Sequence, residues 1–184
     1  EKLERHDSIP RTYFSYIGTV AADHSFYEFL NFVEWAIKEN KMPELRFLIA
    51  TKSSFTVPEF LKDSQRITIQ QGRPLTDEEI NAYYASTIVV WNAYARTTQS
   101  GVLAKSFMFG TPALVLRKNC NEFAQDGIEI KAIEDNTNKD EIAAAIVEVK
   151  KNFLFYSSNC RKRFMESFYY RQYNEQFRAL IEKL

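Results

Sequence analysis

A polar segment that leads into a glycine is the strongest chemical signal in this sequence. Gln99 and Ser100 come directly before Gly101 and Val102, and apolar residues at helical spacing continue from there to Phe109. The first N–H groups of a helix have no partner within it and lie at the positive end of its dipole, so this segment can bind a phosphate group. The structural alternative is that Ser100 only caps the helix and that Gly101 only allows close packing.

Two further groups of small or polar residues follow apolar runs of the kind that form buried strands. Open α/β sheets bind ligands beyond the carboxyl ends of their strands, so these residues are candidates for the same site as the Ser100 segment. They are Gly18 and Thr19 after one run, and Gln70, Gln71 and Gly72 after another. The sequence therefore predicts one binding site along a single edge of a sheet.

The sequence lacks the motifs of several common classes of binding and catalytic site. The sequence has no Gly-x-Gly-x-x-Gly, Gly-x-x-x-x-Gly-Lys-Ser/Thr or Gly-x-Ser-x-Gly motif, which argues against dinucleotide binding, P-loop hydrolysis and a nucleophile elbow. The two histidines, His6 and His24, have no link in sequence to a nucleophile, and we expect His24 to be a surface residue near the phosphate-binding edge. Cys120 and Cys160 lack Cys-x-x-Cys spacing, so we expect no metal site and a reducing compartment.

Apolar runs and capping signals divide the chain into alternating strands and helices. Strands are expected at Tyr13–Ile17, Leu45–Ala50, Arg66–Gln70, Thr87–Trp91, Pro112–Leu116 and Gly127–Ile130. Helices are expected from Phe26 to about Lys41, near Pro58–Lys62, from Thr76 to about Tyr84, over Ser100–Phe109, over Glu122–Gln125, and from Asn138 onward with breaks near Asn152 and Tyr170. Two helices are predicted to begin in capping boxes, Ser25 with Glu28 and Thr76 with Glu79.

Strands that alternate with helices indicate right-handed crossovers and a parallel sheet covered on both faces. We therefore predict an α/β fold, a Rossmann-like doubly wound parallel sheet with a C-terminal helical extension. The length of 184 residues suits one such domain. Its expected parts are a polar lead-in over residues 1–10, a Rossmann-like domain over 11–150, and C-terminal helices over 151–184 that pack on this domain or on an N-terminal domain. Because the chain opens with Glu1, we expect it to be a fragment of a longer protein.

The composition is that of a soluble globular chain. It is 45% hydrophobic and 26% charged, which excludes disorder, and no apolar run is long enough to span a bilayer. The 24 basic and 24 acidic residues cancel, so the chain lacks the basic field of a nucleic-acid-binding protein. We expect no nucleic-acid partner.

Four motifs between Leu75 and Gly127 follow one another at characteristic spacing. They are LTDEEINAYYASTIVV from Leu75, SGVL from Ser100, FGTPALV from Phe109 and NEFAQDG from Asn121. Their order resembles the carboxyl-terminal, donor-binding domain of GT-B glycosyltransferases of the family 4, or group 1, type. The similarity extends from about Tyr13 to Ile146.

This resemblance implies one half of a GT-B fold that holds a nucleotide-sugar donor, a UDP- or GDP-sugar, without a further cofactor. The amides of Ser100, Gly101 and Val102 would face its diphosphate, together with Gly18 and Thr19. Gln70, Gln71 and Gly72 would lie near the nucleobase, and Gln99 and Lys105 would also belong to the donor-binding site. The full-length protein would be a cytoplasmic hexosyltransferase of polysaccharide biosynthesis with a saccharide or lipid-linked acceptor. The isolated fragment would be inactive, because the acceptor and any general base come from across the cleft, and no catalytic residue is assigned.

The sequence departs from that family at two positions that usually carry glutamates. They fall on Thr97 and Lys105. The second glutamate would bind the ribose, so Lys105 either directs a positive charge at a phosphate or leaves the ribose to other groups. The alternative function is a degenerate, non-catalytic module that binds a nucleotide or a protein.

The last part of the chain, residues 153–184, mixes basic and aromatic side chains. Such a mixture can bind anionic lipid or nucleic acid. The same mixture can cover an N-terminal domain. We favour this second interpretation, because the balanced overall charge weakens the electrostatic case for lipid or nucleic acid. Contact with the inner face of the membrane is compatible with that packing, because such enzymes often use membrane-bound acceptors.

Overall fold

Six short strands form one parallel sheet in the computed structural model, which describes residues 9–96, 101–174, 178 and 181–182. The strands are β1 (Tyr13–Ile17), β2 (Arg46–Ala50), β3 (Ile67–Gln70), β4 (Thr87–Asn92), β5 (Ala113–Leu116) and β6 (Ile130–Ile133). Their order is β3-β2-β1-β4-β5-β6, and each neighbouring pair is parallel. This confirms the predicted Rossmann-like doubly wound sheet.

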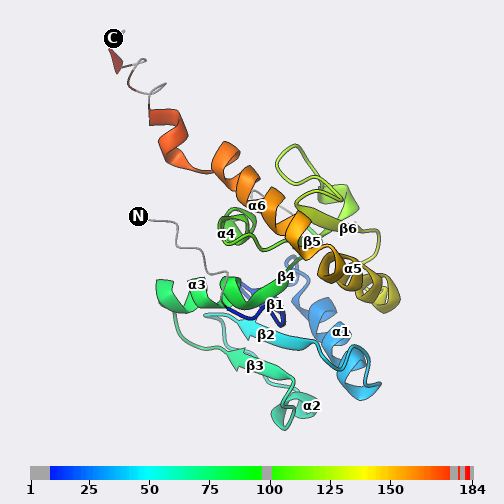
Figure 1. Ribbon diagram of the computed structural model, residues 1–184. Coiled ribbons are helices and arrows are strands. Elements are labelled where there is room, and N and C mark those ends of the chain that lie inside the picture. Colours follow the sequence, from blue (N-terminus) through cyan, green and yellow to red (C-terminus); the bar gives the residue numbers. More distant parts are fainter. Residues whose placement is uncertain (1–8, 97–100, 175–177, 179–180, 183–184) are drawn as a thin grey trace.

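The helices cover both faces of this sheet (Figure 1). They are α1 (Phe26–Lys38), α2 (Glu59–Lys62), α3 (Asp77–Ser86), α4 (Gly101–Met108), α5 (Lys139–Lys151) and α6 (Phe153–Ser167), with the 3₁₀ turns η1 (Arg117–Asn119) and η2 (Tyr170–Tyr173). Helices α1 and α5 contribute to the core on one face, and α3, α4 and α6 contribute to the core on the other. Both faces are therefore apolar, as expected for a parallel sheet.

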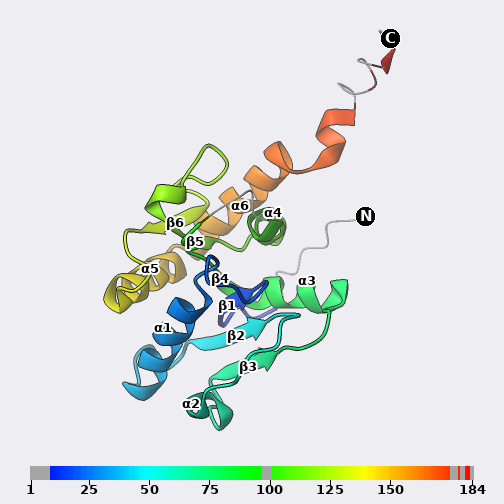
Figure 2. The same cartoon turned by 180° about the vertical axis from the view of Figure 1, so that it is seen from behind.

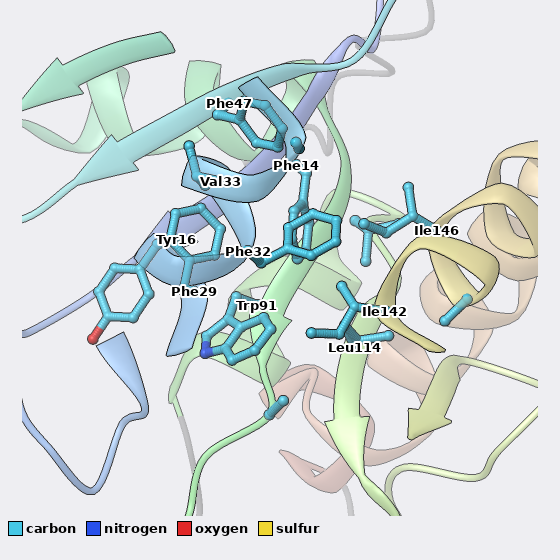
Figure 3. Packing of buried hydrophobic residues seen from close by; sticks show 14 of the residues in the cluster. Phe14, Tyr16, Phe29, Phe32, Val33, Phe47, Trp91, Leu114, Ile142 and Ile146 are labelled. Atoms are coloured by element: carbon cyan, nitrogen blue, oxygen red, sulfur yellow. The ribbon is translucent and has the colours of Figure 1, made fainter. Parts of the chain in front are cut away.

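A group of aromatic side chains packs together within the larger core (Figure 3). Phe14 of β1 is fully buried, with its ring centroid 5.3 Å from that of Phe29, 5.7 Å from Phe32 and 6.0 Å from Trp91. Successive side chains of a strand point to opposite faces, so Phe14 and its second neighbour Tyr16 both lie in this core. These contacts fix α1 against the centre of the sheet, and with it the loop that joins β1 to α1.

One of the two predicted capping boxes is present. Thr76 Oγ1 accepts from the Glu79 amide at 3.2 Å, and the Glu79 carboxylate accepts from the Thr76 amide at 2.8 Å. The prediction for Ser25 and Glu28 is wrong, because Ser25 is in the left-handed region with φ 53° and makes no side-chain cap hydrogen bond. Its hydroxyl instead accepts from the Ala95 amide at 3.0 Å, so a tertiary contact replaces the local one.

The segment after β5 also differs from the prediction. Glu122–Gln125 is not a helix, and the last strand covers Ile130–Ile133 rather than Gly127–Ile130. Gly127 has φ 74° and donates to the Ile130 carbonyl at 2.9 Å, which makes a turn where we expected a strand. The buried Glu129 carboxylate accepts from Arg163 Nε at 2.7 Å, so this part of the loop is fixed by α6.

Helix α6 packs against α4 and against the segment that precedes β6. It begins beside the amino-terminal edge, where the Phe153 ring lies 5.0 Å from the Arg11 guanidinium, and the predicted break at Asn152 separates it from α5. It ends beside the loop that follows β5, where Phe168 and Phe123 are 6.1 Å apart. The turn η2 that follows lies beyond the end of α6, farther from the sheet (Figure 2).

Candidate functional site

The centre of the sheet contains a topological switch point. β1 and β4 are neighbours, but the chain moves outward to β2 and β3 after β1, and outward in the other direction to β5 and β6 after β4. The loops after β1 and β4 therefore diverge and leave a crevice at the carboxyl edge, where doubly wound sheets bind ligands. Gly18 and Thr19 form one side of it, and Tyr94 follows β4 on the other.

Hydrogen bonds hold these two loops against each other. Trp91 Nε1 donates to the His24 carbonyl at 3.3 Å, and the Arg96 amide donates to the Asp23 carbonyl at 3.3 Å. The contact between Ala95 and Ser25 adds a third connection. These hydrogen bonds fix the positions of the two loops that flank the switch point.

Gly18 and Tyr94 meet across the crevice. Gly18 has φ 154°, which L side chains rarely adopt, and a Cβ atom added there would lie 3.7 Å from the Tyr94 hydroxyl oxygen. Burial, as the largest cause, raises the pKa of Tyr94 to about 12. At neutral pH this hydroxyl keeps its proton and can donate a hydrogen bond.

A small pocket opens beside Gly18. Its volume is about 290 Å³, and it lies between the carboxyl ends of β1 and β2 and the start of α3. Ile17, Gly18, Thr19, Ala50, Thr51, Lys52, Pro74, Leu75 and Ile80 line it. Apolar walls with a few polar groups at the rim suit one moiety of a ligand, such as a flat heterocycle. A larger hollow of about 430 Å³ lies between α1 and α5, away from the switch point.

The residues expected near a nucleobase have structural hydrogen bonds. Gln71 Oε1 accepts from the Phe55 amide at 2.7 Å, and the Gly72 amide donates to the Ser53 carbonyl at 3.3 Å. Gly72 has φ 77°, so a side chain there would be strained. These contacts fix the loop after β2, and with it Thr51 and Lys52 at the pocket, while Gln70 ends β3 and its carbonyl accepts from the Thr51 amide at 2.9 Å.

The predicted phosphate-binding helix is partly visible. Helix α4 begins at Gly101, which is exposed and has nothing within 4 Å of an added Cβ atom, so a ligand can approach the backbone here. Val102 follows in the first turn. Lys105 Nζ lies 5.7 Å from the Phe109 ring centroid, toward the far end of α4. Thr97, Gln99 and Ser100 lie outside the described residues.

Sequence reasoning did not assign Thr51, Lys52, Leu75, Ile80 or Tyr94 to the site. Tyr94 comes two residues after the end of β4, so the rule that selected Gly18 could also have selected it. Leu75 and Ile80 could not be found in this way, because neither follows a strand. Leu75 precedes α3 and Ile80 lies in its first turn, and both reach the pocket because α3 packs beside it.

The chain resembles several solved glycosyltransferases in its fold. It matches the pneumococcal O-GlcNAc transferase GtfA, solved with UDP and GlcNAc, at TM-score 0.71 and 18% identity, over 100% of this chain and 38% of that chain. It matches the C-terminal domain of the group 1 glycosyl transferase LpcC from Francisella tularensis at TM-score 0.66 and 12% identity, over 91% of both chains. It matches Anabaena Alr3699/HepE, solved with UDP-glucose, at TM-score 0.67 and 11% identity, over 95% of this chain and 49% of that chain.

No protein-family model and no curated protein sequence matches this chain. The likeness therefore concerns the fold, and this chain spans well under two thirds of GtfA and of HepE.

The described part of the chain lacks two further features. None of its helices is long and apolar enough to cross a membrane. It also holds no group of three or more His, Cys, Asp or Glu side chains that could bind a metal ion.

Proposed function

We propose that this chain is the nucleotide-sugar-binding half of a glycosyltransferase that transfers a sugar to a saccharide or lipid-linked acceptor. The observation that carries the proposal is the topological switch point between β1 and β4, with the pocket of about 290 Å³ beside Gly18. A nucleoside diphosphate needs N–H donors for its phosphates and an apolar recess for its base. The likeness in fold to glycosyltransferases solved with UDP or UDP-glucose supports the same conclusion.

The residues divide between the parts of the donor. The diphosphate lies between Gly18 and Thr19 on one side and the start of α4 on the other, where Gln99, Ser100, Gly101 and Val102 contribute. Lys105 supplies positive charge if its side chain turns from Phe109 toward that end of the helix. The base lies in the pocket beside Thr51 and Lys52, with Gln70, Gln71 and Gly72 supporting the loop around it.

The parent enzyme would have a second, N-terminal domain that faces this edge and binds the acceptor. We propose a hexosyltransferase that uses a UDP- or GDP-sugar in polysaccharide biosynthesis, in the cytoplasm or at the inner face of the membrane. The present chain alone would not catalyse transfer, because positioning of the two reactants supplies a large part of the rate enhancement and half of a cleft cannot provide it.

A second candidate function is a non-catalytic module that binds a nucleotide or a protein. The observation that favours it is Lys105, which stands where the resemblance places a ribose-binding glutamate and lies over Phe109 in this structure. A chain that lost its donor contacts would keep the crevice as a remnant of the fold.

Isothermal titration of the chain with UDP, GDP, ADP and their sugars separates the two functions. We expect binding of UDP or GDP, with a clear preference for one base, because the pocket has fixed walls. Absence of binding by every nucleotide tested, in this chain and in the full-length protein, would favour the non-catalytic module and contradict our proposal.

A further inference from the structure

His24 and Tyr94 form a stacked pair at the switch point. Their ring centroids are 4.5 Å apart and their planes differ by 14°. The two residues come from the two loops that flank the crevice, and Tyr94 also lies over Gly18. The pair therefore places an imidazole beside the turn where the donor's phosphates are expected.

The hydrogen-bond pattern defines the orientation of this imidazole. His24 Nδ1 lies 3.1 Å from the Thr19 carbonyl oxygen, which can only accept, so Nδ1 carries the hydrogen. The Tyr16 hydroxyl donates to the same carbonyl at 2.5 Å, which fixes the position of the acceptor. None of the described residues partners Nε2, the nitrogen on the opposite side of the ring.

The loop that precedes His24 offers no cation to an anionic ligand. The loop from Gly18 to Ala22 contains no basic residue. Charged or titratable side chains at this edge come from β1, the loop itself, α1 and the segments that follow β2, β4, β5 and β6: Tyr16, Asp23, Glu28, Lys52, Tyr94, Arg96, Arg117, Lys118, Glu134 and Asp135. Arg117 is already paired with Asp126 and Glu134, and a protonated His24 would place a positive charge directly beside Gly18 and Thr19.

We propose that His24 contacts the phosphate groups of the donor through Nε2 and that Tyr94 positions its ring. The inference rests on the proposed function and names a phosphate-binding residue within the same site. Because Nδ1 already carries a hydrogen, Nε2 donates to a phosphate oxygen only when the imidazole is protonated. The phosphate contact is therefore a charge-assisted hydrogen bond that strengthens as the pH falls.

The test compares His24→Gln with the wild type, using UDP and inorganic pyrophosphate as separate probes. Glutamine is of similar size and can still donate to the Thr19 carbonyl, but it cannot become a cation. Tyr94→Phe keeps the aromatic stack and loses the hydroxyl. His6→Gln removes the other histidine of the sequence and serves as the matched control.

Dissociation constants are measured between about pH 6 and pH 8, the range in which histidine changes its charge. We expect His24→Gln to weaken binding of both probes about tenfold near pH 6 and less near pH 8, as for the loss of a charge-assisted hydrogen bond. Tyr94→Phe should keep the pH dependence, and His6→Gln should match the wild type. Circular dichroism and the thermal midpoint verify that each variant is folded.

The outcomes separate this inference from the proposed function. If UDP and pyrophosphate bind His24→Gln as they bind the wild type at every pH, the inference is wrong and the proposed function stands. If pyrophosphate shows the His24 effect but no nucleotide binds, the phosphate contact stands and the proposed function is wrong. If neither probe binds the wild type, and GDP and ADP also fail to bind, both are overturned.

Discussion

The two edges of the sheet use polar groups in opposite ways. At the amino-terminal edge, the Arg11 guanidinium donates to the carbonyls of Tyr84 at 3.2 Å, Thr87 at 2.9 Å and Phe109 at 2.5 Å, and to the Thr111 hydroxyl at 2.8 Å. At the carboxyl edge, by contrast, a glycine turn, an open helix start and a small pocket face outward. One edge is closed by a charged side chain that binds several backbone carbonyls, and the other exposes backbone and a pocket to solvent.

Two glycines show the same contrast. A Cβ atom at Gly110, at the amino-terminal edge, would lie 2.5 Å from Ser157 Oγ and 3.1 Å from the Ser157 carbonyl, whereas one at Gly101 would meet nothing within 4 Å. Gly110 is required by packing, and Gly101 is not. A glycine that packing does not require is a better indication of a binding surface than one that packing explains.

The largest effect is expected from Arg11→Met. It leaves several carbonyl acceptors without their charged donor, and each such loss is costly, so we expect the free energy of unfolding to fall by about 4 kcal/mol. Urea denaturation measures this fall. The affinity of the folded variant for nucleotide should equal that of the wild type. A loss of affinity as large as the loss of stability would show that the two edges are coupled.

Gly110→Ala should destabilise the protein by about 3 kcal/mol, because φ is 63° and the new methyl group would overlap Ser157. The thermal midpoint reports this loss. Gly127→Ala is the control, since its φ of 74° imposes the backbone cost but its Cβ would meet nothing within 4 Å. Equal destabilisation of both variants would show that the backbone conformation, and not the contact with α6, makes Gly110 necessary.

Tyr94 makes the carboxyl edge sensitive to alkali. Its pKa is about 12 in the folded chain against 10.0 ordinarily, so the unfolded state loses this proton first as the pH rises. The contribution of the protonated hydroxyl to the free energy of unfolding is fully present below about pH 10. It falls by about 2–3 kcal/mol as the pH rises to about 12. Urea titrations across this range should show a smaller fall in Tyr94→Phe. The same fall in both proteins would assign the alkaline sensitivity to other buried tyrosines, such as Tyr16 and Tyr84, whose pKa values are also raised by burial.

Gly101→Val tests the open helix start without disturbing the fold. A helix accepts valine better than glycine, so the stability should stay within about 0.5 kcal/mol of the wild type. The branched side chain should keep phosphate oxygens away from the first amides of α4, and we expect UDP to bind about tenfold more weakly, or about 1.4 kcal/mol. Calorimetry measures the affinity. Unchanged binding would place the phosphates away from α4.

The smallest effect is expected from Lys105→Glu. The ammonium group must leave Phe109 to reach a phosphate, so we expect reversal of its charge to weaken UDP binding by up to about 1 kcal/mol. Lys105→Met separates loss of charge from reversal. Tighter binding by Lys105→Glu would instead indicate that a glutamate here restores a ribose contact.

Local signals in the sequence predicted most of the sheet. The apolar run Tyr13–Ile17 and the capping box of Thr76 with Glu79 succeed because neighbouring residues decide them. The box at Ser25 fails because the hydroxyl binds Ala95, which is distant in sequence. No local pattern carries that information.

The candidate site also combines residues that local sequence predicts with contacts that it does not. The sequence indicates Gly18 and Gly101, because glycines at strand and helix ends are marked by type and position. The stack of His24 on Tyr94 depends on how two loops from different parts of the chain meet. The residue pattern within either loop does not predict that these two rings stack.

The ion pair between Glu129 and Arg163 joins two segments that are translated at different times. The Glu129 carboxylate is buried, and its cationic partner lies 34 positions later in the chain. A ribosome makes residue 129 first, so the nascent loop holds an acid that cannot be buried unpaired without a large cost in free energy. The loop that follows β5 therefore gains this ion pair only after Arg163 of α6 has been translated.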